Sequence, residues 1–91
     1  MKITVRVSGN ISSVIGKRHE IELPTGATIS TLANRIGEQT GQHQGYLGRF
    51  RVGSKDLCFL LNGKNIDMLN GVLTLLKDGD EVMIIQPTVG G

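Results

Sequence analysis

Only one stretch of this chain has the apolar spacing of a helix, and that limits the possible folds more than any other feature. After Thr28, apolar residues recur at helical intervals at Ile29, Leu32, Ala33 and Ile36. Thr28 suits the N-cap position, and Gly41 suits the left-handed residue that follows a helix. We therefore predict a single amphipathic helix of about three turns, which can cover one face of a sheet.

The other patterned segments have the character of strands. Residues 2–8 and 19–23 alternate between apolar and polar side chains, and the glycine-containing link between them predicts an antiparallel hairpin. Residues 57–61 form a further strand. The Asn62-Gly63 pair that follows predicts a type I′ turn into a short return strand, because both central residues of that turn need positive φ. Residues 81–86 form the last strand.

The order of these segments predicts an α+β fold. A crossover through the helix places the first strand beside the last and parallel to it, at the centre of the sheet. A mixed sheet of about four or five strands crossed by one main helix is the β-grasp arrangement. We expect residues 1–87 to form this domain, with a tight helical turn within 69–76, and residues 88–91 to form a flexible diglycine tail.

Composition excludes several classes of protein. A chain of 91 residues has room for one domain with a modest core. Its formal net charge of +2 is too small to drive binding to nucleic acid or to a membrane surface. The longest apolar run, residues 57–61, is far shorter than a membrane span, and the lone Cys58 fits a reducing compartment. We expect a cytoplasmic protein that binds neither nucleic acid nor membrane.

Residues with the chemistry of catalysis or metal binding are sparse. His19 and His43 have no carboxylate or cysteine at the spacing of metal ligands, so we expect no metal, no other cofactor and no catalytic residue. Cys58 lies within an apolar run and is interpreted as a small buried hydrophobe. The basic residues of the 42–56 segment are typical of a solvated loop, with contact to a partner as the alternative.

Two strands are apolar on both faces, although one helix covers only one face. Residues 57–61 and 82–85 lack charged and amide side chains, as strands do when both sides of a sheet are covered. Either the long 42–56 segment folds over the second face, or an apolar face remains for a partner. The side chains that we expect on such a partner-binding face are Phe59, Leu61, Met83 and Ile85.

The final residues, Pro87-Thr88-Val89-Gly90-Gly91, directly follow the strand expected at the sheet centre. Four residues beyond Pro87 extend roughly 13 Å, and the last two can enter a narrow channel because they have no side chains. The α-carboxylate of Gly91 is ionised at neutral pH and can attack the α-phosphate of ATP. The resulting acyl group is open to a sulfur or amine nucleophile. The sequence thus predicts a protein that is itself the substrate of covalent chemistry at Gly91.

Three segments in the last third of the chain resemble a known family. They are Leu61-Asn62-Gly63-Lys64, residues 76–82 and Pro87-Thr88-Val89-Gly90-Gly91. In this order and spacing they look like the small subunit of molybdopterin synthase (MoaD) and its relatives. Those relatives are the thiamine sulfur carriers (ThiS) and the small archaeal modifier proteins, all of them ubiquitin-like β-grasp domains. The thiamine carriers are typically shorter and lack a counterpart of the 42–56 segment.

The resemblance implies that the chain is not an enzyme but a sulfur-carrier co-substrate or a non-catalytic small subunit. An E1-like enzyme would adenylate Gly91. The adenylate would then become a thiocarboxylate that donates sulfur in molybdopterin (molybdenum or tungsten cofactor) biosynthesis; the alternative is an isopeptide bond with a lysine of a target protein. Gly90, Val89 and Thr88 would form the tail that enters the partner, which in the molybdopterin case is the large subunit of the synthase. The apolar sheet face would dock that partner.

Overall fold

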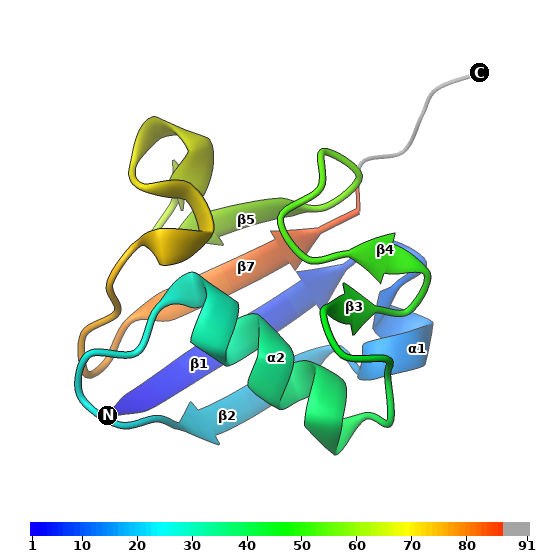
Figure 1. Ribbon diagram of the computed structural model, residues 1–91, viewed down its shortest axis with the longest axis horizontal. Coiled ribbons are helices and arrows are strands. Elements are labelled where there is room, and N and C mark those ends of the chain that lie inside the picture. Colours follow the sequence, from blue (N-terminus) through cyan, green and yellow to red (C-terminus); the bar gives the residue numbers. More distant parts are fainter. Residues whose placement is uncertain (87–91) are drawn as a thin grey trace.

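Five strands form one mixed sheet, and the strands that come first and last along the chain lie side by side in it (Figure 1). In the computed structural model, which describes residues 1–86, the strands of this sheet are β1 (Lys2–Ser8), β2 (Arg18–Glu22), β5 (Cys58–Leu61), β6 (Lys64–Asn65) and β7 (Glu81–Ile85). Their order across the sheet is β2-β1-β7-β5-β6. β1 and β7 are parallel at the centre, and the other neighbouring pairs are antiparallel. The predicted α+β, ubiquitin-like β-grasp fold is confirmed.

The predicted helix, α2 (Ile29–Gln39), lies across one face of this sheet (Figure 1). Thr28 is its N-cap and forms a capping box with Thr31. The Thr31 N–H donates to Thr28 Oγ1 (3.3 Å), and the Thr28 N–H donates to Thr31 Oγ1 (3.2 Å). Both amides belong to the helix start, where the helix itself offers no acceptor. The core lies between the helix and the sheet, and the helix buries Ile29, Leu32, Ala33 and Ile36 in it.

Replacing Thr28 with alanine should lower the free energy of unfolding by about 1 kcal/mol, because the Thr31 N–H loses its acceptor. Thr25→Ala is the matched control, since Thr25 is exposed in the turn just before the helix. We expect that control to change stability by less than about 0.5 kcal/mol. Urea unfolding measures both variants. Equal losses for the two would contradict the capping role.

Asn62 and Gly63 turn the chain between β5 and β6, and both have positive φ (49° and 86°), as a type I′ turn requires. Asn62 also bonds to the start of β7. Its Nδ2 donates to Asp80 Oδ1 (3.0 Å), and its Oδ1 accepts from the Glu81 N–H (2.9 Å). The hairpin and the acidic turn, which carry the family resemblance, therefore meet in space and hold the beginning of β7.

Two connections contain helical structure. α1 (Ser12–Ile15) is a short helix within the predicted β1–β2 hairpin, where the sequence indicated only a link. The tight helical turn expected within residues 69–76 is confirmed as the 3-10 turn η2 (Gly71–Leu73), and a second 3-10 turn that was not expected, η1 (Ile66–Met68), precedes it. No helix within residues 1–86 has the length and apolarity to cross a membrane.

The 42–56 segment packs on the same side of the sheet as α2. It forms two short strands, β3 (Tyr46–Leu47) and β4 (Phe50–Arg51), which pair only with each other. Leu47 is fully buried, and a Cβ on Gly37 of α2 would lie 3.2 Å from the Tyr46 carbonyl oxygen. Figure 1 shows β3 and β4 in front of the sheet, beside α2. The 42–56 segment therefore does not cover the sheet face opposite α2, and the structure supports the alternative in which that face is left open.

Candidate functional site

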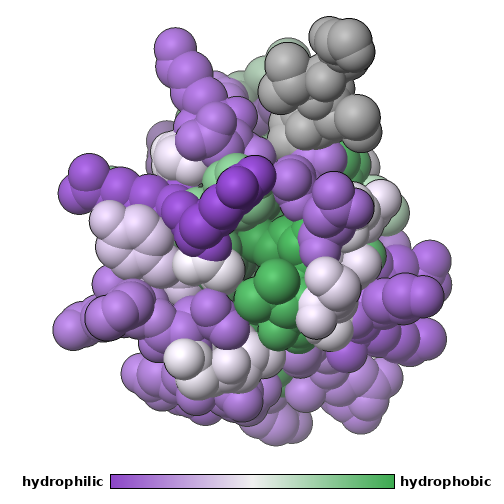
Figure 2. Space-filling view, turned by 90° about the vertical axis from the view of Figure 1, so that its right-hand side faces the viewer, coloured by the Kyte–Doolittle hydropathy of each residue, from purple (hydrophilic) through white to green (hydrophobic). Residues whose placement is uncertain are grey.

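Gln86 anchors the point at which the chain leaves the sheet. It directly follows the central strand β7, and its N–H donates to the Ser8 carbonyl oxygen (3.1 Å). Its side-chain Oε1 accepts from the Ile11 N–H (2.8 Å). Figure 2 looks onto this end of the molecule, where a hydrophobic area lies among hydrophilic residues. The last described residue is thus held by one bond to the end of β1 and one to Ile11, just before α1.

The predicted tail lies outside the described part of the chain. Thr88, Val89, Gly90 and Gly91 all follow residue 86, so the structure places none of them. The domain boundary at residue 87 and the role of Gly91 as the reactive acyl group remain predictions. What the structure defines is the position of Gln86 and the surfaces next to it.

Gly9 passes Gln86 at a distance that suits glycine alone. A Cβ on Gly9 would lie 2.8 Å from Gln86 Cβ and 3.0 Å from the Gln86 carbonyl oxygen. Gly9 also has a φ of +94°, which residues with a side chain rarely adopt. The close approach brings the Ser8 carbonyl and the Ile11 amide to their bonds with Gln86. Glycine at this position therefore positions the start of the tail.

Gly9→Ala should destabilise the protein by about 1–3 kcal/mol more than Gly26→Ala does, because only the first variant crowds Gln86. Gly26 is a matched control: its φ is +91°, and a Cβ there would meet nothing within 4 Å. Urea unfolding of the two variants measures the difference. If the two losses of stability are equal, the positive φ alone explains the need for glycine at position 9, and the close contact with Gln86 does not contribute.

The four side chains expected on one open sheet face lie on two different faces. Phe59 is paired with Ile84 and Leu61 with Val82, and paired residues project to the same side of a sheet. That side is the core, where Phe59 is 2% and Leu61 9% exposed. The expectation that Phe59 and Leu61 lie on a partner-binding face is wrong, because the register turns both toward α2.

The open face instead carries an apolar group that we name the open-face patch: Cys58, Leu60, Met83 and Ile85, all partly exposed. Cys58 pairs with Ile85, and Leu60 pairs with Met83. Arg6 of β1 is the register partner of Met83 and is exposed, so the patch has a basic neighbour. Met83 and Ile85 thus lie on the face that the sequence analysis expected for them.

Cys58 and Leu60 belong to this patch, although the sequence analysis did not place them there. A strand that is apolar at every position gives no indication of which residues face the helix. The Asn62-Gly63 turn fixes the register of β5 and β6 but does not separate the two faces, because it pairs Leu60 with Asn65 and Leu61 with Lys64, both of them polar.

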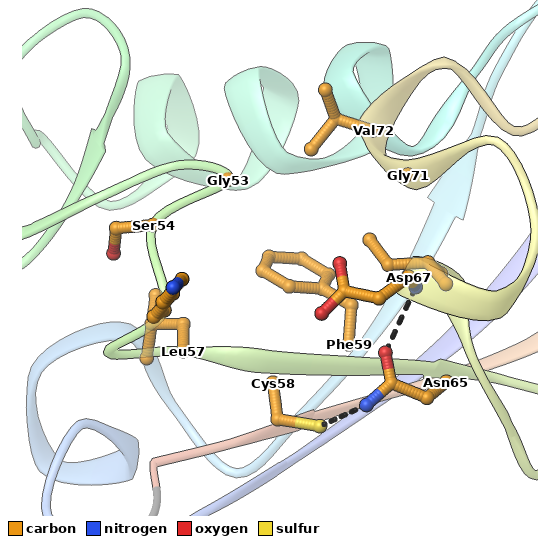
Figure 3. Close-up of a pocket in the computed structure, with 11 residues that line it drawn as sticks. Gly53, Ser54, Leu57, Cys58, Phe59, Asn65, Asp67, Gly71 and Val72 are labelled. Atoms are coloured by element: carbon orange, nitrogen blue, oxygen red, sulfur yellow. Dashed lines mark hydrogen bonds between the residues drawn. The ribbon is translucent and has the colours of Figure 1, made fainter.

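Cys58 is partly exposed, which corrects its interpretation as a buried hydrophobe. Figure 3 shows its side chain on the opposite side of β5 from the ring of Phe59. The Asn65 Nδ2 donates to Cys58 Sγ (3.4 Å), and Asn65 Oδ1 accepts from the Asp67 N–H (2.9 Å). Asn65 therefore caps η1 and contacts the thiol at the same time.

The two histidines do not form a joint site. His19 Nε2 is hydrogen-bonded to the Ile15 carbonyl oxygen, whereas His43 lines a separate hollow beside α2. Within residues 1–86, no group of three or more histidine, cysteine, aspartate or glutamate side chains could hold a metal ion. The candidate functional surfaces that we consider are therefore the apolar ones around the end of β7.

Comparisons with known proteins bear on both the fold and the family. The ThiS family model matches residues 5–91. None of the curated protein sequences matches this chain. Among solved structures, small archaeal modifier protein 1 of Haloferax volcanii is 15% identical with a TM-score of 0.79, and the alignment covers 100% of both chains.

Two further solved structures carry names from molybdopterin synthesis. A Pyrococcus furiosus protein described as molybdopterin converting factor subunit 1 is 26% identical, with a TM-score of 0.76 and coverage of 97% of this chain and 99% of that one. The complex of subunits 1 and 2 of the Helicobacter pylori molybdopterin-converting factor contains a chain that is 24% identical, with a TM-score of 0.63 and full coverage of both chains. Since the family model extends from β1 to Gly91, this protein belongs to the ThiS family of ubiquitin-like sulfur carriers and modifiers.

Proposed function

We propose that this protein is a small sulfur carrier whose Gly91 carboxylate is adenylated by an E1-like enzyme and converted to a thiocarboxylate, which donates sulfur in molybdopterin biosynthesis. The observation that carries the proposal is the match to the ThiS family through the diglycine end. The similarity to molybdopterin converting factor subunit 1 of Pyrococcus furiosus supports the molybdopterin branch. In this role the chain is a co-substrate and not the catalyst.

The proposed chemistry takes place at the carbonyl carbon of Gly91. A carboxylate oxygen of Gly91 attacks the α-phosphorus of ATP, a phosphorus–oxygen bond forms, and pyrophosphate leaves. A hydrosulfide ion then attacks the acyl carbon, AMP leaves with the bridging oxygen, and the released proton passes to water or a base. The product is a thiocarboxylate, in which one carboxylate oxygen is replaced by sulfur. Gly91 has no Cβ, so both attacks meet little steric hindrance.

The described residues give this chemistry a defined starting point. Gln86 holds the beginning of the tail at the end of a central strand, through bonds to Ser8 and Ile11. The open-face patch, which includes Ile85 directly before Gln86, offers apolar surface for a partner beside the tail. The Helicobacter pylori converting factor, solved as a complex of subunits 1 and 2, supports a protein partner, here the large subunit of molybdopterin synthase.

The second candidate function is a ubiquitin-like modifier joined to target lysines through Gly91. The similarity to small archaeal modifier protein 1, with a TM-score of 0.79, favours it. Adenylation is the same in this case. A lysine amine then attacks the acyl carbon, AMP leaves, and an isopeptide bond forms with loss of a proton.

Intact-mass measurement separates these functions. The protein is incubated with an E1-like enzyme from the same genome, ATP and sulfide, and reactions without ATP are the control. Replacement of one oxygen by one sulfur in the mass supports the sulfur carrier. Tryptic digestion of cell protein that yields lysines bearing residues 78–91 of this chain supports the modifier, because Lys77 is the last lysine or arginine before the diglycine. An unchanged mass together with no such lysines would contradict both.

A further inference from the structure

A second apolar surface lies at the point where the chain leaves the sheet, on the side of α1 and β4. It is a hollow of about 450 Å³ that we name the tail-root groove, lined chiefly by Ile11, Val14, Gly48, Arg49, Phe50 and Gln86. Figure 2 looks onto this end of the molecule and shows its hydrophobic area. The groove is separate from the open-face patch, because it is formed by α1, the β3–β4 turn and Gln86, and none of the patch residues lines it.

The groove has an apolar floor that is accessible from outside. Ile11 is almost fully buried at 2% exposure, whereas Val14 is 50% exposed and Phe50 is partly exposed. Gly48 faces Val14: a Cβ on Gly48 would lie 3.6 Å from Val14 Cγ1 and would take up part of the hollow. An apolar side chain from another molecule can therefore reach the floor.

The rim of the groove is basic. Arg49 is exposed, and its guanidinium carbon lies 5.3 Å from the centre of the Phe50 ring, which holds the cation above the apolar floor. The residues that line the groove include no aspartate or glutamate, and no ion pair within residues 1–86 involves Arg49. The groove therefore fits an apolar group that stands next to a carboxylate.

The chain's own tail is a poor occupant. Residues 87–91 include two glycines, which offer no side chain and lose the most conformational freedom on binding, and Val89 is their one branched aliphatic residue. A single valine side chain and a solvent-exposed ion pair with Arg49 contribute little binding free energy.

An enzyme that acts on Gly91 comes close to the groove. Five residues beyond Gln86 span at most roughly 16–18 Å, so the enzyme's surface must come within that distance of Gln86. Gln86 itself lines the groove, and Ile85, directly before it, belongs to the open-face patch. A partner that surrounds the start of the tail therefore contacts apolar surface on both sides of the sheet.

We propose that the tail-root groove binds an apolar side chain flanked by a carboxylate, presented by the E1-like enzyme that adenylates Gly91. This inference rests on the proposed function and adds to it a recognition surface on the helix side of the sheet. The groove contributes to binding of the enzyme and not to the chemical step.

ATP–pyrophosphate exchange by the E1-like enzyme tests the groove, because exchange reports reversible adenylation of Gly91. Val14→Asp removes apolar surface and repels a carboxylate, and Arg49→Glu reverses the charge of the rim. We expect each variant to lower kcat/KM at least tenfold through a higher KM, with kcat unchanged. Leu73→Asp is the matched control: Leu73 is 69% exposed, lies in η2 and does not line the groove, so its kinetics should equal those of the unaltered chain.

The possible outcomes distinguish failure of the groove proposal from failure of the proposed function. Unaltered kinetics for Val14→Asp and Arg49→Glu, with exchange still dependent on Gly91, would overturn the groove and leave the proposed function in place. A lower kcat with unchanged KM would also overturn it. Absence of exchange with the unaltered chain would overturn the proposed function, and the groove with it. Thermal melts show whether the variants fold; if Val14→Asp does not, Arg49→Glu decides, because Arg49 lies on the surface.

Discussion

Removing Gly90 and Gly91 should abolish adenylation of this protein and leave its fold unchanged. The proposed nucleophile is the Gly91 carboxylate, and a shorter tail ends before that group reaches the ATP. Within the part of the chain that the structure describes, the hydrophobic core runs from Ile3 to Ile84, and both bonds that anchor Gln86 lie within residues 8–86. We therefore expect the free energy of unfolding to change by less than about 0.5 kcal/mol.

Pyrophosphate exchange and urea unfolding measure the two parts of this prediction. Removal of Gly91 alone is the matched variant: it keeps a glycine at the end of the chain but shortens the tail by one residue. We expect it to be inactive as well, because the position of the carboxylate is what changes. A truncated chain that is still adenylated would show that Gly91 is not the activated residue.

Ile84→Asp should unfold the protein, whereas Ile85→Asp should fold and lose partner binding. The two neighbours lie on opposite faces of β7: Ile84 is fully buried and paired with Phe59, while Ile85 is partly exposed and paired with Cys58. A buried carboxylate without a partner costs several kcal/mol, a large share of the roughly 5–15 kcal/mol that stabilises an ordinary domain. On the open face the carboxylate stays in contact with water and disturbs only the open-face patch.

Circular dichroism and thermal melts measure folding, and the KM in pyrophosphate exchange measures recognition. Ile84→Val and Ile85→Val are the controls, because they keep an apolar side chain. For Ile84→Val we expect a loss of about 0.5–1.5 kcal/mol. Equal loss of stability in Ile84→Asp and Ile85→Asp would mean that the two faces are not distinct. A folded Ile85→Asp with unaltered kinetics would remove the open-face patch from the binding surface of the adenylating enzyme.

The sequence by itself determined the elements whose signals are local. Thr28 and the apolar spacing after it specify α2, because capping and helical periodicity depend on residues a few positions apart. Asn62-Gly63 specifies its turn in the same way, since both residues must accept positive φ. The parallel pairing of β1 with β7 also follows, from the rule for strands joined across a helix. The prediction of chemistry at Gly91 comes from the sequence as well, because it depends on covalent structure and not on packing.

Only the tertiary structure decided which side chains share a surface. β5 and residues 82–85 of β7 are apolar at every position, so alternation cannot separate Phe59 from Cys58; the register with the neighbouring strands does. The side of the sheet taken by β3 and β4 depends on the packing of Leu47 under α2. The tail-root groove combines α1, the β3–β4 turn and Gln86, which are far apart in the chain. A periodic sequence pattern shows which side chains of a strand face the core only when the two sides of that strand differ in polarity. Contacts between segments that are distant in the chain leave no periodic pattern at all.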